Sequence, residues 1–250
     1  MLASETCWTA ASWPAPANIK AGTTTRIPGC SQPPFDSFNL AMHVGDAAQD
    51  IVQNRSDLIE ILNLPSEPVW LQQIHSGNAV QYRKGMVSPR ADAMYTNLQG
   101  IVCVVLTADC IPILLCASSG QEIAVVHAGW RGLNKGIITN ALKEFSADPG
   151  EIMAWIGPGI SREHYEVGDD VRQAFKGLPA AVLDECFTPA DQNKWLADLA
   201  GLATAELKSA GLTGVYHSGH CTYRDSSRYF SYRREKKTGR MASLIWIDHG

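Results

Sequence analysis

The stretch that decides the fold is Ile101–Gly132, which reads IVCVVLTADCIPILLCASSGQEIAVVHAGWRG in this 250-residue chain. It holds three apolar runs, Ile101–Thr107, Ile111–Cys116 and Glu122–Val126. Continuous apolar runs rich in β-branched residues are typical of strands that are covered on both faces. Cys110 follows the first run and His127 follows the third, so each stands where a buried strand stops. Rigid strand ends that open into loops are common places for chemistry, and we therefore expect a functional site here.

The segments on either side mix strand and helix patterns without strict alternation. Strands are predicted over Ile19–Thr25, Val69–His75, Ile152–Ile156 and Met241–Ile247. Helices are predicted over Ala47–Leu62, Asn134–Phe145, Gly168–Lys176 and Asn193–Ala210,. Asp46, with Gln49 three residues later, is typical of a capping box at the start of the first helix. The mixture predicts an α/β fold with a mixed sheet core covered by helices, rather than a doubly wound fold.

The composition is that of a folded protein with a sizeable core. Of the 250 residues, 45% are hydrophobic and 18% are charged, which is enough for one large domain or two small ones,. Residues 1–18 are rich in alanine, proline and tryptophan, and we expect them to form a loose N-terminal arm.

Charge and cysteine use exclude several classes of protein. The net charge of −4 provides no basic field, so we expect no nucleic-acid partner,. No apolar run approaches the roughly 20 residues of a membrane span, and the N-terminus lacks the basic and apolar regions of a signal peptide. The seven cysteines are an odd number without a C-x-x-C pair. This pattern favours reduced thiols and a cytoplasmic location.

Three predicted strand ends carry side chains that bind metals: His75, Cys110 and His127. Two imidazoles and a thiolate form a donor set that zinc accepts, and three protein ligands leave the fourth tetrahedral position free for water or substrate. Their long spacings match no local zinc ribbon. The competing interpretation is a buried free cysteine with two ordinary histidines, because cysteine is among the most buried residues.

A second hypothesis uses the same atoms without a metal. Cys110 would be a nucleophile with His127 as its base, and Asp109 or His75 would orient that base. Both hypotheses require a deprotonated Cys110, stabilised either by zinc or by an imidazolium. The residues alone leave the two open.

Arginines are the other chemical feature of the chain: Arg55, Arg131, Arg233 and Arg234. A guanidinium is a planar fork that binds phosphate or carboxylate at two points. If several of them converge on the cluster of His75, Cys110 and His127, the ligand carries an anion. Taken singly, each is more commonly solvated or paired with a surface carboxylate.

A series of short motifs resembles the YfiH/laccase-domain family, in the family's order, across about residues 19 to 248. They are Phe38-Asn39-Leu40, His43-Val44-Gly45-Asp46, Asn54-Arg55, Gln73-Ile74-His75, Asp92-Ala93, Thr107-Ala108-Asp109-Cys110-Ile111-Pro112, His127-Ala128-Gly129-Trp130-Arg131-Gly132, Trp155-Ile156-Gly157-Pro158, Tyr165-Glu166-Val167-Gly168, Cys221-Thr222-Tyr223, Phe230-Ser231-Tyr232-Arg233-Arg234 and Thr238-Gly239-Arg240. The resemblance implies a single catalytic α/β domain over residues 19–250. Its mixed β-sheets would be sandwiched between helices and related to a cysteine-hydrolase toxin fold.

The resemblance also implies a site and an activity. The metal ligands would be His75, Cys110 and His127, usually with zinc. The activity would be phosphorolysis of the purine nucleosides adenosine, inosine and guanosine, giving free base and ribose 1-phosphate. Methylthioadenosine phosphorylase and adenosine deaminase activities are associated with it.

Two alternatives come with the same family. One is a copper-dependent polyphenol oxidase, or laccase. It ranks second, because a multicopper enzyme needs many histidines, and of the seven here only His217 and His220 lie close together in the sequence. The other is editing of peptidoglycan precursors, or hydrolysis of an amide by Cys110 or a metal.

Substrate-binding roles follow from the two substrates that phosphorolysis requires. Arg55, Arg233 or Arg234 would bind phosphate, and Asn39 or His43 would form hydrogen bonds with the sugar or base. Asp109 and Trp130 flank the ligands in the sequence. We expect both to have structural roles or to orient the ligands without contacting the metal.

Overall fold

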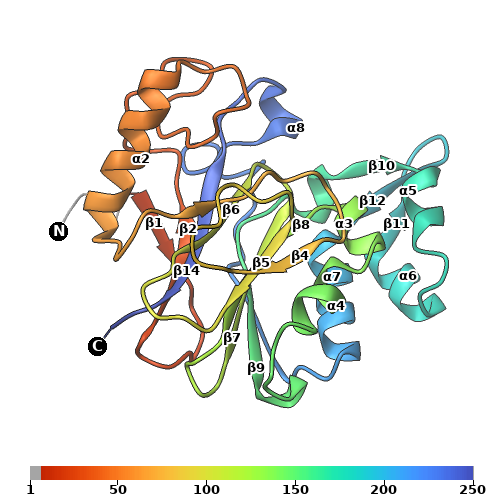
Figure 1. The fold of residues 1–250 in the computed structure, drawn as a ribbon. Helices are drawn as coiled ribbons and strands as arrows, with labels where there is room; N and C mark the ends of the chain where they lie inside the picture. Colours follow the sequence, from red (N-terminus) through yellow and green to blue (C-terminus); the bar gives the residue numbers. More distant parts are fainter. Residues whose placement is uncertain (1–6, 250) are drawn as a thin grey trace.

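Two β-sheets face one another at the centre of the computed structural model, which describes residues 7–249 (Figure 1). The five-stranded sheet has the order β1 (Trp8–Ala10), β2 (Ile19–Thr24), β14 (Met241–Ile247), β6 (Cys103–Thr107), β3 (Val69–Trp70). The six-stranded sheet has the order β13 (Gly214–His217), β9 (Ile152–Ile156), β7 (Ile111–Ala117), β8 (Ile123–Ala128), β5 (Ala93–Thr96), β4 (Ala79–Gln81). Both sheets combine parallel and antiparallel pairs.

The space between the two sheets is filled by side chains from both. Cys103 and Val105 of β6 pack in one cluster with Leu114 and Cys116 of β7. The alternate residues of β6, among them Val104, point to the opposite face and pack with Leu58 of α2 (Ala48–Leu62). β6 is therefore covered on both faces, which is why its sequence is continuously apolar.

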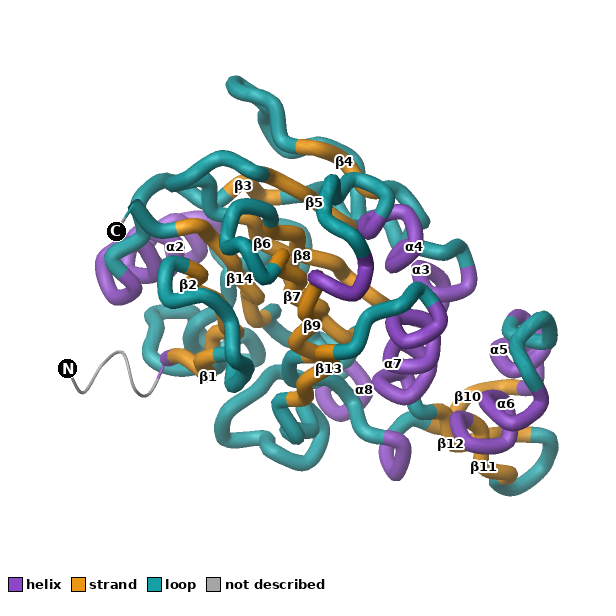
Figure 2. Tube along the Cα trace, turned by 90° about the horizontal axis from the view of Figure 1, so that it is seen from below, coloured by secondary structure: helices purple, strands orange, loops and turns teal. Residues whose placement is uncertain are grey.

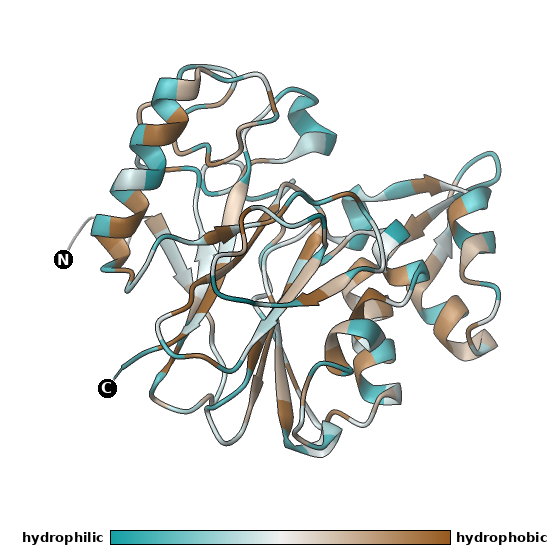
Figure 3. Cartoon of the chain, in the orientation of Figure 1, coloured by the Kyte–Doolittle hydropathy of each residue, from teal (hydrophilic) through white to brown (hydrophobic). Residues whose placement is uncertain are grey.

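Helices cover the outer face of each sheet. The helix α2 covers the five-stranded sheet, and the six-stranded sheet is covered by α3 (Trp130–Asn134), α4 (Ile137–Leu142) and α7 (Leu199–Ser209). Apolar residues follow the central strands, whereas α2 carries both hydrophilic and hydrophobic residues (Figure 3). Ile51 and Leu58 are the buried apolar residues of this helix. The predicted α/β fold, with mixed sheets between helices, is confirmed.

A small lobe stands to one side of these layers. It contains a three-stranded sheet and two short helices, namely β10 (Glu166–Gly168), β12 (Lys194–Ala197), β11 (Phe187–Pro189), α5 (Asp169–Ala174) and α6 (Ala180–Cys186). Figures 1 and 2 both show the lobe at the edge of the molecule next to α7. The remaining elements are short: η1 (Pro149–Glu151), η2 (Arg162–His164) and α8 (Tyr232–Glu235).

Two predicted helices are divided in the structure. The prediction of one helix over Asn193–Ala210 is wrong, because Lys194–Ala197 is strand β12 and the side chain of Asp198 accepts a hydrogen bond from the Gly201 amide to start α7. The prediction over Asn134–Phe145 is also wrong at its start. Asn134 ends α3, and Gly136, with a φ of 71°, separates it from α4,.

The start of α2 differs from the predicted capping box. Its N-cap residue is Ala47, without a side-chain cap. The Asp46 carboxylate instead accepts hydrogen bonds from the side chain of Asn39 and the amide of Ala47. The Asp46 carboxylate is therefore used in a contact with the preceding loop, and it does not form a capping box with the first turn of α2.

Two further predictions change at the ends of strands. The strand predicted over Val69–His75 stops at Trp70, and the chain continues as an irregular loop. The predicted loose arm over residues 1–18 is wrong for Trp8–Ala10, which pairs antiparallel with β2. Residues 1–6 lie outside the described part. Within residues 7–249, no helix combines the length and apolarity that crossing a bilayer requires.

Candidate metal centre

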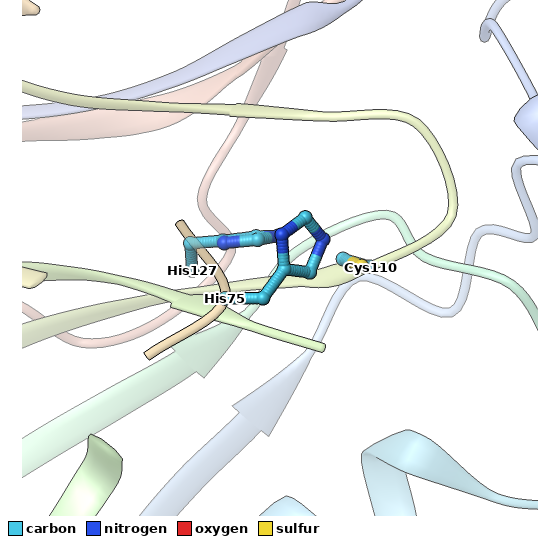
Figure 4. Close-up of side chains that lie close together, drawn as sticks. All are labelled: His75, Cys110 and His127. Atoms are coloured by element: carbon cyan, nitrogen blue, oxygen red, sulfur yellow. The ribbon is translucent and has the colours of Figure 1, made fainter. Parts of the chain in front are cut away.

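The structure brings together the three side chains that the sequence singles out, His75, Cys110 and His127 (Figure 4). The nitrogen and sulfur atoms that can act as ligands all lie within 4.8 Å of one another. The two imidazole rings meet edge to face, with their centroids 4.8 Å apart and their planes at 81°. His75 is exposed, Cys110 is half-buried and His127 is only 4% exposed, so the cluster is open on the side of His75.

The cluster lies where the two sheets meet. His75 comes from the loop after β3 of the five-stranded sheet. Cys110 lies between β6 and β7, which belong to different sheets, and His127 lies near the end of β8 in the six-stranded sheet. His75 also lies between strands of different sheets, since β4 belongs to the six-stranded sheet. One ion at this position would therefore bind β8 together with two connections that run from one sheet to the other.

The carboxylate of Asp92 organises two of the three candidate ligands. Its Oδ1 lies 2.8 Å from Nδ1 of His127 and accepts a hydrogen bond from the amide of His75. Its Oδ2 accepts from the amide and the hydroxyl of Ser76. Because Nδ1 of His127 faces the carboxylate, Nε2 is the nitrogen left for a metal. Burial would raise the pKa of Asp92, but the bonds from His127 and Ser76 hold it well below its usual range.

Cys110 and His127 favour opposite charges. Burial would raise the pKa of the Cys110 thiol, but attraction to His127 and hydrogen bonds from His127 and His75 lower it to about 6. Burial would lower the pKa of His127, but the Cys110 charge and the bond with Asp92 raise it to about 9. The metal-free site therefore favours a thiolate beside an imidazolium. A metal would take the place of the proton on Nε2 of His127.

Gly129 leaves the space that the Cys110 sulfur occupies. A Cβ atom at this position would lie 2.8 Å from Sγ of Cys110 and 3.5 Å from Cδ2 of His75. The HAGWRG motif therefore supplies one candidate ligand, His127, and also the glycine that leaves room for the Cys110 sulfur.

Asp109 connects the Cys110 loop to the C-terminal part of the chain. Its φ of 94° lies in the region that favours glycine, and its side chain is 8% exposed,. Oδ1 accepts from the hydroxyl of Thr222 at 2.7 Å, and Oδ2 accepts from the amide of Arg233 at 2.6 Å. Its carbonyl accepts from the amide of Ile160. Asp109 therefore connects its own loop to the segments that contain Ile160, Thr222 and Arg233. This is the form that its predicted supporting role takes in the structure.

Two arginines near the cluster keep donors without a described partner. Arg233 uses one Nη1 bond to the carbonyl of Glu166, and its guanidinium lies 5.0 Å from the ring centroid of Tyr165. Arg240 donates from Nη1 to the carbonyls of Thr238 and Gly239. Both retain Nε and Nη2 donors, which an anion can accept.

Arg240 was missed as a site residue in the sequence, where it appears only as the end of a motif. Burial lowers its pKa, while the charges of Cys110 and Asp109 oppose that shift, which places the guanidinium within electrostatic reach of the cluster. Its position directly before the last strand was the only local signal. Asp92 was missed in the same way, as a single acid before β5.

The other two predicted phosphate ligands are occupied by structural contacts. All five donors of Arg234 are used: Nη1 reaches the carbonyls of Thr222 and Tyr223, Nη2 reaches the Tyr229 carbonyl and Glu235, and Nε reaches Glu235. Arg55 donates twice to the carbonyl of Leu40 and stacks on Trp70 at 3.6 Å. Arg234 has no donor left for phosphate. Arg55 keeps its Nη1 donors and one Nη2 donor, but one face of its guanidinium is covered by Trp70.

Of the two predicted nucleoside contacts, only His43 stays accessible. Asn39 is fully buried, and its amide group donates to the Ala41 carbonyl and Asp46 and accepts from the amides of Ala41 and Arg240. It therefore supports the loop and Arg240 rather than facing a ligand. Burial lowers the pKa of His43, with further contributions from the charges of Arg240, Arg55 and His75, so a neutral ring is favoured near the cluster.

The donor set fits a zinc ion. Tetrahedral bonds of about 2.0 Å to nitrogen and about 2.3 Å to sulfur place ligand atoms about 3.3–3.5 Å apart. The present limit of 4.8 Å would therefore contract by roughly 1.3 Å around one ion, a shift shared between the two side chains that lie furthest apart,. The Asp92 contact to His127 supplies the outer support that zinc-binding histidines usually have,. A thiolate with two imidazoles also suits copper.

Comparison with known proteins gives the same family from sequence and from structure. The model of the family described as multi-copper polyphenol oxidoreductase laccase matches residues 20–248. A relative from Escherichia coli K12, named purine nucleoside phosphorylase YfiH, is 43% identical over 236 residues, which cover 94% of this chain and 96% of the relative. A Haemophilus influenzae relative named purine nucleoside phosphorylase is 43% identical over 243 residues, covering 95% and 98%.

Two solved structures share the whole fold. The crystal structure of the Neisseria meningitidis protein NMB0706 has a TM-score of 0.92 and 42% identity, covering 97% of this chain and 99% of its own. That of the Bacillus licheniformis hypothetical protein YfiH has a TM-score of 0.87 and 29% identity, covering 92% and 93%. The resemblance seen in the motifs is therefore confirmed, and the chain belongs to the family described as multi-copper polyphenol oxidoreductase laccase, together with the YfiH proteins.

Proposed function

We propose that this chain is a zinc-dependent purine nucleoside phosphorylase that acts on adenosine, inosine and guanosine. The observation that carries the proposal is the convergence of His75, Cys110 and His127 beside two arginines, Arg233 and Arg240, that keep free donors. The names of relatives that are 43% identical over nearly the whole chain support it.

Phosphate is assigned to Arg233 and Arg240. Phosphate is a mixture of monoanion and dianion near neutral pH, and two guanidinium groups with unused Nε and Nη2 donors offer it charge-assisted hydrogen bonds. The Arg233 backbone is fixed by Asp109, the residue next to Cys110. The Arg240 backbone is fixed by Asn39. The anion would therefore be held at a defined position relative to the cluster.

The nucleoside is assigned to the open side of the cluster, at His75 and His43. In phosphorolysis, the bond from the sugar C1′ to the purine nitrogen breaks and a phosphate oxygen bonds to C1′. The purine leaves with the bonding electron pair and needs a proton or a hydrogen-bond donor. A neutral His43 can donate one hydrogen bond to the sugar or the base.

His75, Cys110 and His127 would hold the zinc. When bound, zinc supplies a Lewis acid that polarises a substrate oxygen or lowers the pKa of a water molecule. Asp92 fixes the ring of His127 and the loop of His75 in the orientation that this requires.

Two further activities belong to the proposal. Methylthioadenosine is cleaved by the same bond exchange, with phosphate replacing the purine. Adenosine deamination replaces the 6-amino group by an oxygen from water and releases ammonia, so it needs no phosphate. We also propose that the protein works in the cytoplasm, as its odd number of cysteines without a C-x-x-C pair suggests,. We further propose that it binds no nucleic acid, as its net charge of −4 suggests,.

Copper-dependent polyphenol oxidation is the second candidate, favoured by the description of the matching family. The thiolate and imidazoles can bind copper. Within residues 7–249, however, one cluster of three His, Cys, Asp or Glu residues has metal-binding geometry, whereas a multicopper enzyme needs several copper positions. Editing of peptidoglycan precursors, or Cys110-dependent amide hydrolysis, is the third reading and rests on the thiolate alone.

The deciding experiment combines metal analysis with a nucleoside assay. The purified protein is analysed for zinc and copper and then incubated with inosine, with and without phosphate, while hypoxanthine is measured. We expect bound zinc and phosphate-dependent release of base. Cys110→Ala should lose both zinc and turnover, whereas Cys30→Ala, which alters a half-buried thiol outside the cluster, should keep both. Full activity of Cys110→Ala, or base release that ignores phosphate, would contradict the proposal.

A further inference from the structure

A pocket separate from the metal centre lies in the seam between α7 and the small lobe. Its volume is about 490 Å³, within the usual range for small-molecule sites,. One wall comes from α7 and the turn between α3 and α4, and the opposite wall comes from the connection between α5 and α6. None of the residues assigned to the metal centre lines it.

The walls of this seam pocket are mostly apolar. Leu133, Phe175 and Leu202 belong to the buried core, and Leu178 and Val182 pack against that core from the lobe. Gly136 and Gly177 have no side chain to fill the opening. Such a pocket binds the hydrocarbon part of a ligand, and its polar groups decide which kind of ligand.

Glu206 of α7 is the one charged side chain that lines the pocket. Its Oε1 accepts hydrogen bonds from the amide and the hydroxyl of Thr139, at 3.1 and 2.9 Å. No lysine, arginine or histidine within residues 7–249 forms an ion pair with it, and Oε2 has no hydrogen-bond donor there. Burial raises the pKa of this carboxyl group, although the Thr139 bonds oppose that shift.

The structural role of Glu206 accounts for only half of its carboxylate. Gly136 is the N-cap of α4 and provides no side-chain cap, so Oε1 of Glu206 satisfies the amide of Thr139 in the first turn,. That contact would be made equally well by a glutamine. The second oxygen keeps its lone pairs free, and Glu206 is the one charged side chain among the lining residues, so the pocket offers a ligand apolar walls and a single negative charge,.

We infer that the seam pocket binds a small organic monocation, a protonated amine on a compact aromatic or branched hydrocarbon frame. The ammonium would donate to Oε2 of Glu206, and the frame would lie against Phe175, Leu178 and Val182. A cation can form a charge-assisted hydrogen bond with this carboxylate, whereas a neutral ligand forms a weaker bond and an anion is repelled. The inference is independent of the proposed nucleoside activity.

The test uses 2-phenylethylammonium chloride as the probe, with 2-phenylethanol as its neutral counterpart, in isothermal titration calorimetry on the full chain. We expect the ammonium to bind with at least about tenfold higher affinity than the alcohol. Glu206→Gln keeps an oxygen for Thr139 and should lose that preference. Glu151→Gln, at an exposed carboxylate outside the pocket, should retain it.

A second variant tests the pocket without changing the carboxylate. Leu178→Arg places a guanidinium beside Glu206 and should weaken ammonium binding at least about tenfold by occupying the site. Equal affinity for ammonium and alcohol, unchanged binding to Glu206→Gln, or no binding to the wild type at about 10 mM would each overturn the inference.

Discussion

Gly129 sets how closely the backbone approaches the candidate metal ligands. An added methyl group would lie 2.8 Å from the Cys110 sulfur, which is shorter than any ordinary contact,. We therefore predict that Gly129→Ala displaces the thiolate and weakens zinc binding by about 10- to 100-fold, the range seen when support around a metal is disturbed. Competition with a chromogenic chelator measures the affinity. Gly150→Ala, whose new methyl group meets no atom within 4 Å, should bind zinc like the wild type.

Asp92 tests whether the support of His127 matters for the metal. Asp92→Asn keeps the size of the side chain but removes the charge that faces Nδ1 of His127. We predict a zinc affinity about 10- to 100-fold lower, with the ligands still in place. Wild-type affinity in this variant, measured by the same competition, would show that Asp92 acts only on the loop backbone.

Individual residues also show what the sequence could reveal about the site. His75, Cys110 and His127 were recognisable because each stands at the end of an apolar run. Arg234 and Asn39 looked equally suited to a ligand, yet their donors are spent on nearby carbonyls and carboxylates. Whether a polar side chain is free depends on segments far away in the chain, and one sequence does not contain that information.

At the scale of elements, the short helix α8 separates two neighbouring arginines by function. Arg233 points a partly free guanidinium to the Tyr165 side, whereas Arg234 is fully bonded within the C-terminal segment. We predict that Arg233→Ala raises the KM for phosphate at least about tenfold with little change in melting temperature. Arg234→Ala should lower the melting temperature. An unchanged phosphate KM for Arg233→Ala would remove this residue from the anion site.

The anchor of α8 gives a pH dependence of stability. Glu235 accepts hydrogen bonds from Thr238, Arg26 and Arg234. Burial would raise its pKa, but these partners lower it overall. A lowered carboxyl pKa contributes stability above the unfolded-state value, about 4.3, and that contribution is lost as the pH falls towards the folded-state value.

We therefore predict that Glu235→Gln destabilises the protein by about 1–3 kcal/mol at pH 7, from urea unfolding. The difference from the wild type should shrink at pH values below about 4. A difference that stays constant with pH would mean that the glutamine has altered packing rather than a charged network.

The elements were predictable where burial alone decides them. Continuous apolar runs marked β6, β7, β9 and β14, because both faces of each are covered. In the small lobe, the helix predicted over Gly168–Lys176 corresponds to α5. The strand β12 was not predictable, since Lys194–Ala197 carries a helix-like pattern and becomes a strand through pairing with β10 and β11. Local patterns cannot show which distant segment will offer a hydrogen-bonded edge.

At the scale of the whole molecule, the metal centre lies where the chain passes between the two sheets. His75 and Cys110 each lie in a connection from the five-stranded to the six-stranded sheet, and His127 lies in β8 of the six-stranded sheet. A bound ion therefore favours the folded chain over the unfolded one, in which these residues are far apart. At a zinc concentration about 100 times the dissociation constant, the contribution is about 2.7 kcal/mol.

Removal of zinc by a chelator should consequently lower the melting temperature of the wild type by about 5–10 °C, measured by calorimetry, and added zinc should restore it. Cys110→Ser, which lacks the thiolate, should melt at the same temperature with and without chelator. If the wild type also ignored the chelator while zinc was shown to leave, the ion would not stabilise the connections between the two sheets, and their packing of Cys103, Val105, Leu114 and Cys116 would hold the layers together alone.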